Sequence, residues 1–218
     1  MVTQKSIDAL RSELERKKEQ GLMSEKRFIH TLEVEKMALR IAEIYAPDKK
    51  LILSAAALLH DITKEYSFDL QIKLCAEYDL NITKNDYNAP KTLHARTAVG
   101  VIRAEYPELA DEEVLSCVRW HTTGREGMTI CEKIVYLADY IDMSRKFEDC
   151  VRLRDYFFST DIKSMTEQEK ITHLDRTLLM SFDMTLRGLI EDGKPISPDT
   201  IAARNELAVL NIERSEIA

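Results

Sequence analysis

Apolar residues recur at intervals of three and four along most of the chain, which is the period of an amphipathic helix. Ile7 and Leu14 lie on the apolar face of a first helix that ends near Gly21. Ser24 is placed to cap a second helix, which runs to about Tyr45. No segment alternates apolar and polar residues over the length of a convincing strand. The pattern therefore predicts an all-α fold.

Helix start and stop signals extend this prediction along the chain. Residues that can open later helices, as N-caps or capping boxes, are Asp48, Ser67, Asp111, Thr129, Thr166 and Ser197. A further helix is expected from about Leu93 to Tyr106, and Gly193 closes a long one. The segment 158–165 is expected to be a loop. These signals predict a bundle of about eight to ten helices.

Length and composition favour one globular domain. The chain has 218 residues, of which 44% are hydrophobic and 32% are charged, an ordinary mixture for such a domain. We expect a single domain over residues 1–218. Within it, residues 1–22 form an N-terminal amphipathic helix and residues 206–218 form a C-terminal tail.

Charge and hydropathy exclude several classes of protein. The net charge is −7, from 31 basic and 38 acidic residues, which does not suit broad nucleic-acid binding. No apolar run approaches the roughly 18 residues that span a bilayer, and the N-terminus has no signal-peptide core. We therefore expect a cytoplasmic protein with no membrane or nucleic-acid partner. No Cys-x-x-Cys pair occurs, so buried reduced thiols are expected at Cys75, Cys117, Cys131 and Cys150.

Four of the five histidines fall on the apolar stripe of their predicted helix. They are His30, His60, His94 and His121. Asp61 and Asp139 also face inward, and a buried carboxylate is costly unless it is paired or bound to a metal. A single inward histidine is more often a satisfied core residue, which is the role assigned to His173. Four of them with two carboxylates favour one metal centre.

The residue types around this centre indicate its chemistry. Imidazole and carboxylate ligands without thiolate suit iron, manganese, zinc or cobalt, and this ligand set does not identify which of these metals binds. Arg27 precedes His30 by one helical turn, Lys64 follows Asp61 by one turn, and Arg145 lies six residues after Asp139. Each of these cations alone is equally explained as a solvated surface charge. Together they favour a small anionic substrate, such as a phosphoester or phosphoanhydride that metal-activated water would hydrolyse.

The order of these motifs resembles the HD-domain phosphohydrolase superfamily. Its surroundings look more narrowly like the bacterial symmetrical diadenosine tetraphosphate hydrolases, and the match spans about Arg27 to Asn205. The matching segments are Arg27-Phe28-Ile29-His30-Thr31, Leu58-Leu59-His60-Asp61-Ile62-Thr63-Lys64, His121-Thr122-Thr123-Gly124, Ala138-Asp139-Tyr140-Ile141 and Pro195-Ile196-Ser197-Pro198-Asp199-Thr200-Ile201. After Tyr140-Ile141 the family usually has glutamate and proline, whereas this sequence has Asp142 and Met143.

The resemblance implies an all-helical hydrolase that converts diadenosine tetraphosphate to two ADP, usually with iron. It implies metal ligation by His30, His60, Asp61 and Asp139. It implies nucleotide contacts by Arg27, Lys64, His94, His121, Thr122 and Arg145, with His30 and Asp139 bordering the substrate. The segment near the base or ribose would be Pro195, Ile196, Ser197, Pro198, Asp199 and Thr200. On this basis the catalytic residues are Asp61, Lys64, His94 and His121.

Several alternatives stay open at this point. His94 and His121 could complete a second metal site beside one tightly held metal, or they could touch phosphates with His121 as a general acid. A hydrolase of another nucleotide, such as a nucleoside monophosphate, a deoxynucleoside triphosphate or guanosine tetraphosphate, fits the same residues. A di-iron oxygenase and a nucleotide-binding regulator without turnover are rivals from other classes. A homodimer is left open.

Overall fold

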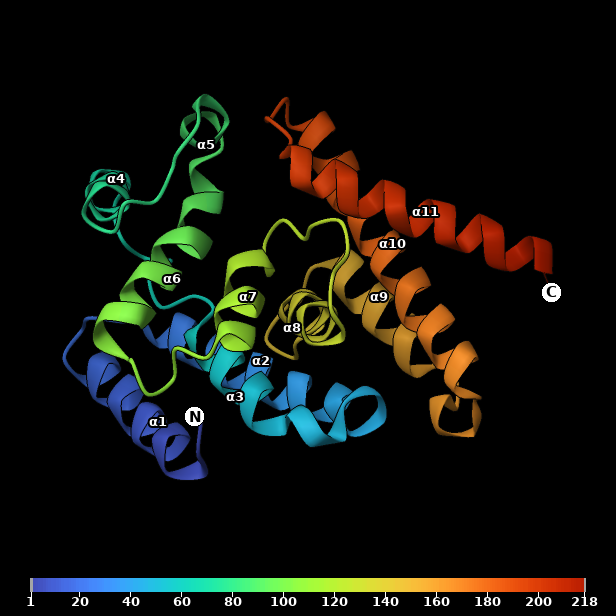
Figure 1. Cartoon of the computed structure of the whole chain (residues 1–218), viewed down its shortest axis with the longest axis horizontal. Coiled ribbons are helices and arrows are strands. Elements are labelled where there is room, and N and C mark those ends of the chain that lie inside the picture. The colour runs from blue at the N-terminus through green and yellow to red at the C-terminus, as the bar shows by residue number, and fades with distance from the viewer. Residues whose placement is uncertain (1, 218) are drawn as a thin grey trace.

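The computed structural model describes residues 2–217, with the side chains of all of these except Asn85 and 215–217. Over this range the chain folds into α-helices and short 3-10 helices without any strand (Figure 1), so the all-α prediction is confirmed. The elements are α1 (Gln4–Glu19), α2 (Glu25–Tyr45), η1 (Pro47–Lys49), α3 (Lys50–Leu59), α4 (Phe68–Glu77), α5 (Lys84–Asn88), η2 (Pro90–Thr92), α6 (Leu93–Glu105), α7 (Glu112–Trp120), α8 (Ile130–Ile141), α9 (Glu148–Phe158), η3 (Ile162–Ser164), α10 (Glu167–Glu191) and α11 (Pro198–Ile217).

Most predicted helix starts are confirmed by their hydrogen bonds. Side chains at Ser24, Ser67 and Asp111 accept backbone N–H groups of the helices they open. Complete capping boxes join Thr129 to Glu132 and Thr166 to Glu169. The predicted loop after α9 holds only the short η3, and Gly193 takes a positive φ of 63° after α10.

Two details differ from the expectations. The part of the chain that the structure describes contains eleven α-helices, one more than the upper expected number, and α5 has only five residues. Asp48 does not cap α3. It lies inside η1, because Pro47 starts a 3-10 turn there, and α3 begins at Lys50 without a side-chain cap. The helix also ends at Leu59, so His60 and Asp61 follow it.

Helix α3 lies at the centre of the fold. It packs against α1, α2, α7 and α8, and every residue from Leu53 to Leu59 is buried. A helix that is apolar all round is stable only when it is surrounded by other elements. The small side chains in the run Ser54-Ala55-Ala56-Ala57 let the neighbouring backbones approach closely. The end of α3 therefore carries His60 and Asp61 into the interior.

The terminal helices are held to this centre by paired charges. Arg11 on α1 lies 2.6 Å from Glu35 on α2. The buried carboxylate of Asp175 on α10 pairs with Lys133 on α8 at 2.7 Å and with Arg214 on α11 at 2.9 Å. Figure 1 shows α8 end-on near the middle, with α10 and α11 to its right and α4 and α5 on the opposite side, at the upper left.

The remaining expectations for the chain have different outcomes. All four cysteines are free and buried, as predicted. Among the described helices, none is both long and apolar enough to cross a membrane. A single domain over residues 1–218 stays a prediction, and Met1 and Ala218 lie outside the described residues.

We expect Ala56→Leu to destabilise the protein by roughly 1–3 kcal/mol, because no space surrounds this fully buried position on α3. The matched control is Ala104→Leu at an exposed position on α6, which should stay within about 0.5 kcal/mol of the wild type. Urea unfolding followed by circular dichroism measures both. Equal effects would show that α3 is not the tightly packed centre.

Candidate metal centre

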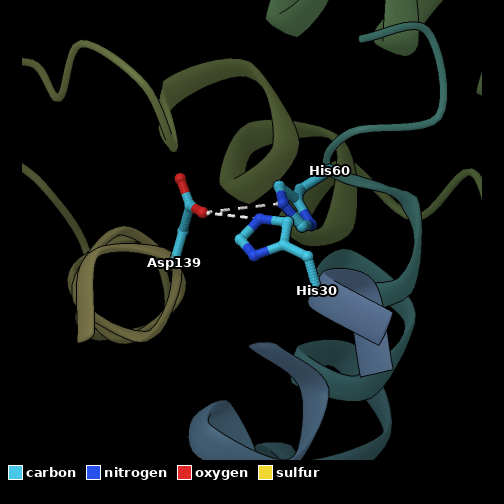
Figure 2. A group of neighbouring side chains, drawn as sticks. All are labelled: His30, His60 and Asp139. Atoms are coloured by element: carbon cyan, nitrogen blue, oxygen red, sulfur yellow. Dashed lines mark ion pairs between the residues drawn. The ribbon is translucent and has the colours of Figure 1, made fainter. Parts of the chain in front are cut away.

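Three side chains from three helices meet at the centre of the fold (Figure 2). His30 comes from the second turn of α2, His60 directly follows α3 and Asp139 lies on α8. The Nε2 atom of His30 lies 3.0 Å from Asp139 Oδ1, and Nε2 of His60 lies 3.8 Å from the same oxygen. These three potential ligand atoms lie within 4.8 Å of one another, and so do those of a second group, His60, Asp61 and His121. The two groups share His60.

The carboxylate of Asp61 joins the two remaining predicted histidines to this centre. His94, in the first turn of α6, places Nε2 3.1 Å from Asp61 Oδ1. His121, directly after α7, places Nε2 3.5 Å from the same oxygen and 3.0 Å from Nε2 of His94. All four histidines predicted to point inward therefore converge. His173 instead contacts the carbonyl oxygen of Phe157 at 3.0 Å, in keeping with a structural role.

The backbone fixes how three of these imidazoles present their nitrogens. The Nδ1 atoms of His60, His94 and His121 donate to the carbonyl oxygen three residues earlier, at 2.6, 2.7 and 2.7 Å respectively. Because the Nδ1 proton is used in this way, the neutral ring presents a lone pair at Nε2. This tautomer is the one that metal-ligating histidines adopt when the second nitrogen is held by a carbonyl.

His30 is oriented by a carboxylate instead. Its Nδ1 lies 3.3 Å from Oδ2 of Asp142, which is completely buried, and 3.4 Å from Oγ of Ser144. Asp142 is itself held in place, because its carbonyl accepts from Arg154 at 2.8 Å and its Oδ1 accepts the backbone N–H of Ser144 at 2.8 Å. Burial disfavours the protonated imidazole, but the nearby carboxylates of Asp139 and Asp142 outweigh this effect and raise the pKa of His30 to about 9.

These residues fit a metal ion. Three buried atoms, Nε2 of His30, Nε2 of His60 and Oδ1 of Asp61, have no hydrogen-bond partner among the described residues. Buried polar atoms without a partner are costly, and a metal ion that takes the place of the His30 proton would satisfy all three. The set offers imidazole nitrogen and carboxylate oxygen without thiolate, which suits a transition metal rather than calcium or magnesium.

Charged groups set the protonation of the two carboxylates. Burial favours the protonated form of Asp61, but the surrounding imidazoles, His60 foremost, hold its pKa well below the usual range. Burial acts in the same direction on Asp139, and the guanidinium of Arg145 is the main group that holds its pKa well below the usual range. Both carboxylates are therefore ionised at neutral pH and are available as ligands.

Three cations border the centre, as predicted from the sequence. Arg27 forms an ion pair with Asp61 Oδ2, Arg145 lies 2.6 Å from Asp139 Oδ1, and Nζ of Lys64 lies 3.9 Å from Asp61 Oδ1. They line one open pocket of about 1060 Å³ together with His30 and Asp61. Burial lowers the pKa of Lys64, and the charge of Asp61 partly opposes this. The pocket thus joins a metal-binding set to fixed positive charge.

Thr122 also lies beside the centre. Its Oγ1 is 3.0 Å from Nε2 of His121 and 3.1 Å from Nε2 of His94. The following turn requires Gly124, whose φ is +63°, and a Cβ at this position would lie 2.6 Å from the ring of Phe182. The backbone of this loop is therefore tightly specified.

The segment 195–200 is not among the described residues that line this pocket. Asp199 instead lies close enough to Arg119 on α7 to oppose the effect of burial, which lowers the pKa of Arg119 to about 10. A contact between this segment and a base or ribose stays a prediction.

Sequence reasoning missed the role of Asp142 as a partner of His30. The signal was weak, because the residue lies beyond the end of α8 and its shorter side chain replaces the family's usual glutamate. Only the path of the chain after α8 shows that the carboxylate turns back toward α2.

The chain belongs to the HD domain family, which its residues 27–144 match. Within this family, the chain is similar to two proteins named "Bis(5'-nucleosyl)-tetraphosphatase, symmetrical". The protein from Bacillus subtilis is 30% identical over 185 residues, which cover 85% of this chain and 91% of that protein. The one from Halalkalibacterium halodurans is 32% identical over 187 residues, which cover 85% of this chain and 90% of that protein. The resemblance found in the sequence is confirmed.

A solved structure shares the fold. It is a predicted HD superfamily hydrolase involved in NAD metabolism from Clostridium acetobutylicum, at a TM-score of 0.77 and 30% sequence identity. The match covers 95% of this chain and 97% of that protein. Because both chains are covered almost completely, the helices outside residues 27–144 also belong to the shared fold.

We expect Asp142→Asn to weaken metal binding by about 10- to 100-fold, since the neutral amide no longer raises the basicity of His30. The dissociation constant of Mn²⁺, measured by titration of metal-free protein, checks this. Asp149→Asn, at an exposed position in the first turn of α9, is the matched control. Equal affinity in the two variants would contradict a role for Asp142 in orienting His30.

Proposed function

We propose that this protein hydrolyses diadenosine tetraphosphate, or a related dinucleoside polyphosphate, symmetrically to two nucleoside diphosphates. One observation carries the proposal: four imidazoles and two carboxylates converge, and two members of this cluster, His30 and Asp61, line a pocket that also presents three cations, Arg27, Lys64 and Arg145. Metal ligands beside fixed cations suit cleavage of a phosphoanhydride. The names of the two relatives support this choice of substrate.

In this proposal His30, His60, Asp61 and Asp139 hold one tightly bound metal, for which iron is the candidate. A bound transition metal supplies a Lewis acid and lowers the pKa of coordinated water, which makes hydroxide available at neutral pH. The carbonyl contact of His60 and the carboxylate contact of His30 keep both rings turned toward the site.

The cations bind the phosphate chain. Arg27 and Arg145 are already held by Asp61 and Asp139, so their guanidinium groups are ordered before the substrate arrives. Each can offer its remaining N–H donors to non-bridging oxygens. Lys64 adds a point charge at the same edge of the pocket. Together they offset the charge that builds up on the phosphate oxygens and on the leaving diphosphate.

His94 and His121 are proposed to act on protons or phosphates at the far side of Asp61. Burial lowers the pKa of both, and that of His94 falls to about 4. Both rings are therefore neutral at pH 7 and present their Nε2 lone pairs, 3.0 Å apart. Two facing lone pairs need a donor nearby, and the hydroxyl of Thr122 and the ammonium of Lys64, whose Nζ lies 3.2 Å from Nε2 of His94, are placed to supply one. For His121 to act as a general acid, Nε2 must first take up a proton.

The first test is a product assay. Metal-loaded protein is incubated with diadenosine tetraphosphate in oxygen-18 water, and the products are analysed by mass spectrometry. We expect ADP alone, with label in half of it, because water attacks one of the two central phosphorus atoms. Asp61→Ala should abolish turnover, since it removes a metal ligand.

Other products would redirect the assignment. AMP with ATP would retain the site chemistry and contradict symmetrical cleavage. Turnover only of another nucleotide would favour the rival hydrolase, oxygen-dependent product formation would favour the di-iron oxygenase, and nucleotide binding without turnover would favour the regulator.

A second test asks whether His94 is a metal ligand. We expect His94→Ala to keep one metal per chain, because His94 is not among the four proposed ligands, and to lower kcat by about 100-fold or more. Elemental analysis and steady-state kinetics measure the two quantities. Two metals per chain in the wild type and one in the variant would instead assign His94 and His121 to a second metal site.

The expected partner is the small nucleotide substrate alone. A homodimer, the absence of nucleic-acid binding and a cytoplasmic location stay predictions from the sequence.

A further inference from the structure

Phe147 is in a position that the fold does not explain. It is the N-cap residue of α9, where serine, threonine, aspartate or asparagine is favoured, and its side chain makes no capping hydrogen bond. It is also 71% exposed, more than any other large apolar side chain among the described residues. A residue that weakens both the local helix start and the solubility of the surface points to a functional role.

Phe147 belongs to the lining of the pocket at the metal centre. Phe147 lines this pocket together with Ile29 and Met143, which are 47% and 48% exposed. Ile29 precedes the predicted ligand His30, and Arg145 lies between Met143 and Phe147 in the chain. Three exposed apolar side chains, called here the apolar wall, therefore line the same pocket as the cations.

We propose that this apolar wall, formed by Ile29, Met143 and Phe147, binds a nucleobase of the substrate, with Phe147 stacking on the base. The identity of the substrate rests on the proposed function above. A nucleotide has a flat aromatic base at one end and phosphate at the other, and the pocket lining holds both an aromatic side chain and cations. Two residues of chain span at most about 7 Å, so a phosphate at Arg145 leaves the attached base within reach of Phe147.

The side chains of the apolar wall suit any nucleobase. Stacking on an aromatic side chain tolerates all bases, because each has a π-face. Met143 is flexible and polarisable and can adapt to the edge of the ring. Continuity with the cation-lined part of the same pocket favours a nucleotide over an apolar partner protein, which would gain nothing from the neighbouring positive charge.

The test compares ligands with and without a base. ADP and inorganic pyrophosphate are titrated into metal-loaded wild type, Phe147→Ser and Phe147→Trp by calorimetry, and the KM for diadenosine tetraphosphate is measured. We expect Phe147→Ser to weaken ADP binding and to raise this KM, each on the order of tenfold, with pyrophosphate affinity unchanged. Phe147→Trp should retain wild-type affinity for ADP.

Two controls exclude a general loss of structure. Serine is the better N-cap, so the Tm of Phe147→Ser should be equal to or higher than that of the wild type. Phe68→Ala changes another exposed phenylalanine, which lies outside the pocket, and should leave ADP binding unchanged.

Three results would overturn the inference: unchanged ADP affinity in Phe147→Ser, an equal loss for ADP and pyrophosphate, or loss only of self-association between copies of the chain. The proposed function fails separately. If the wild type prefers ADP to pyrophosphate through Phe147 but does not cleave diadenosine tetraphosphate, the base subsite stands and the substrate assignment does not.

Discussion

The cost of burying unpaired lone pairs is the constraint on which the site depends. Asp61 is only 4% exposed, and three imidazole nitrogens lie within 3.5 Å of its oxygens. Such a cluster inside an apolar bundle is unfavourable unless positive charge enters it. The cations at the pocket edge supply part of that charge, and a metal ion would supply the rest. The central helix therefore carries its polar groups to a place where a cation stabilises them.

Helix ends explain why so few residues are needed to orient the histidines. The carbonyl groups in the last turn of a helix have no partner within it. His60 and His121 follow α3 and α7 directly, and their Nδ1 atoms donate to carbonyls of those last turns. Each hydrogen bond satisfies an orphan carbonyl and also directs Nε2 inward. The carbonyl groups before His30, in the second turn of α2, are used within the helix, so the carboxylate of Asp142 takes that place.

The pocket brings apolar and cationic side chains together beside the metal centre. Arg27 and Arg145 are ordered by the carboxylates of the centre, and their cationic groups lie beside Ile29 and Phe147. Helix α9 begins after Phe147 without a side-chain capping hydrogen bond. A missing cap lowers the stability of a helix start, which agrees with the proposed role of Phe147 in binding a ligand.

Periodicity in the sequence determined which residues face the interior. The intervals of three and four placed His30, His60, His94 and His121 on buried faces, and all four are buried. Caps such as Ser24 and Thr129 were also predictable, because they depend on contacts within one turn. Asp48 was not, since the preceding proline set a competing turn.

Only the tertiary structure decided which inward groups meet. It joined Asp61 to histidines on two other helices, brought Asp142 to His30 and placed Phe147 in the same pocket as Arg145. It also left the segment 195–200 out of the described lining of that pocket. These relations depend on how helices far apart in the sequence pack together, and the pattern along one helix carries no information about that packing.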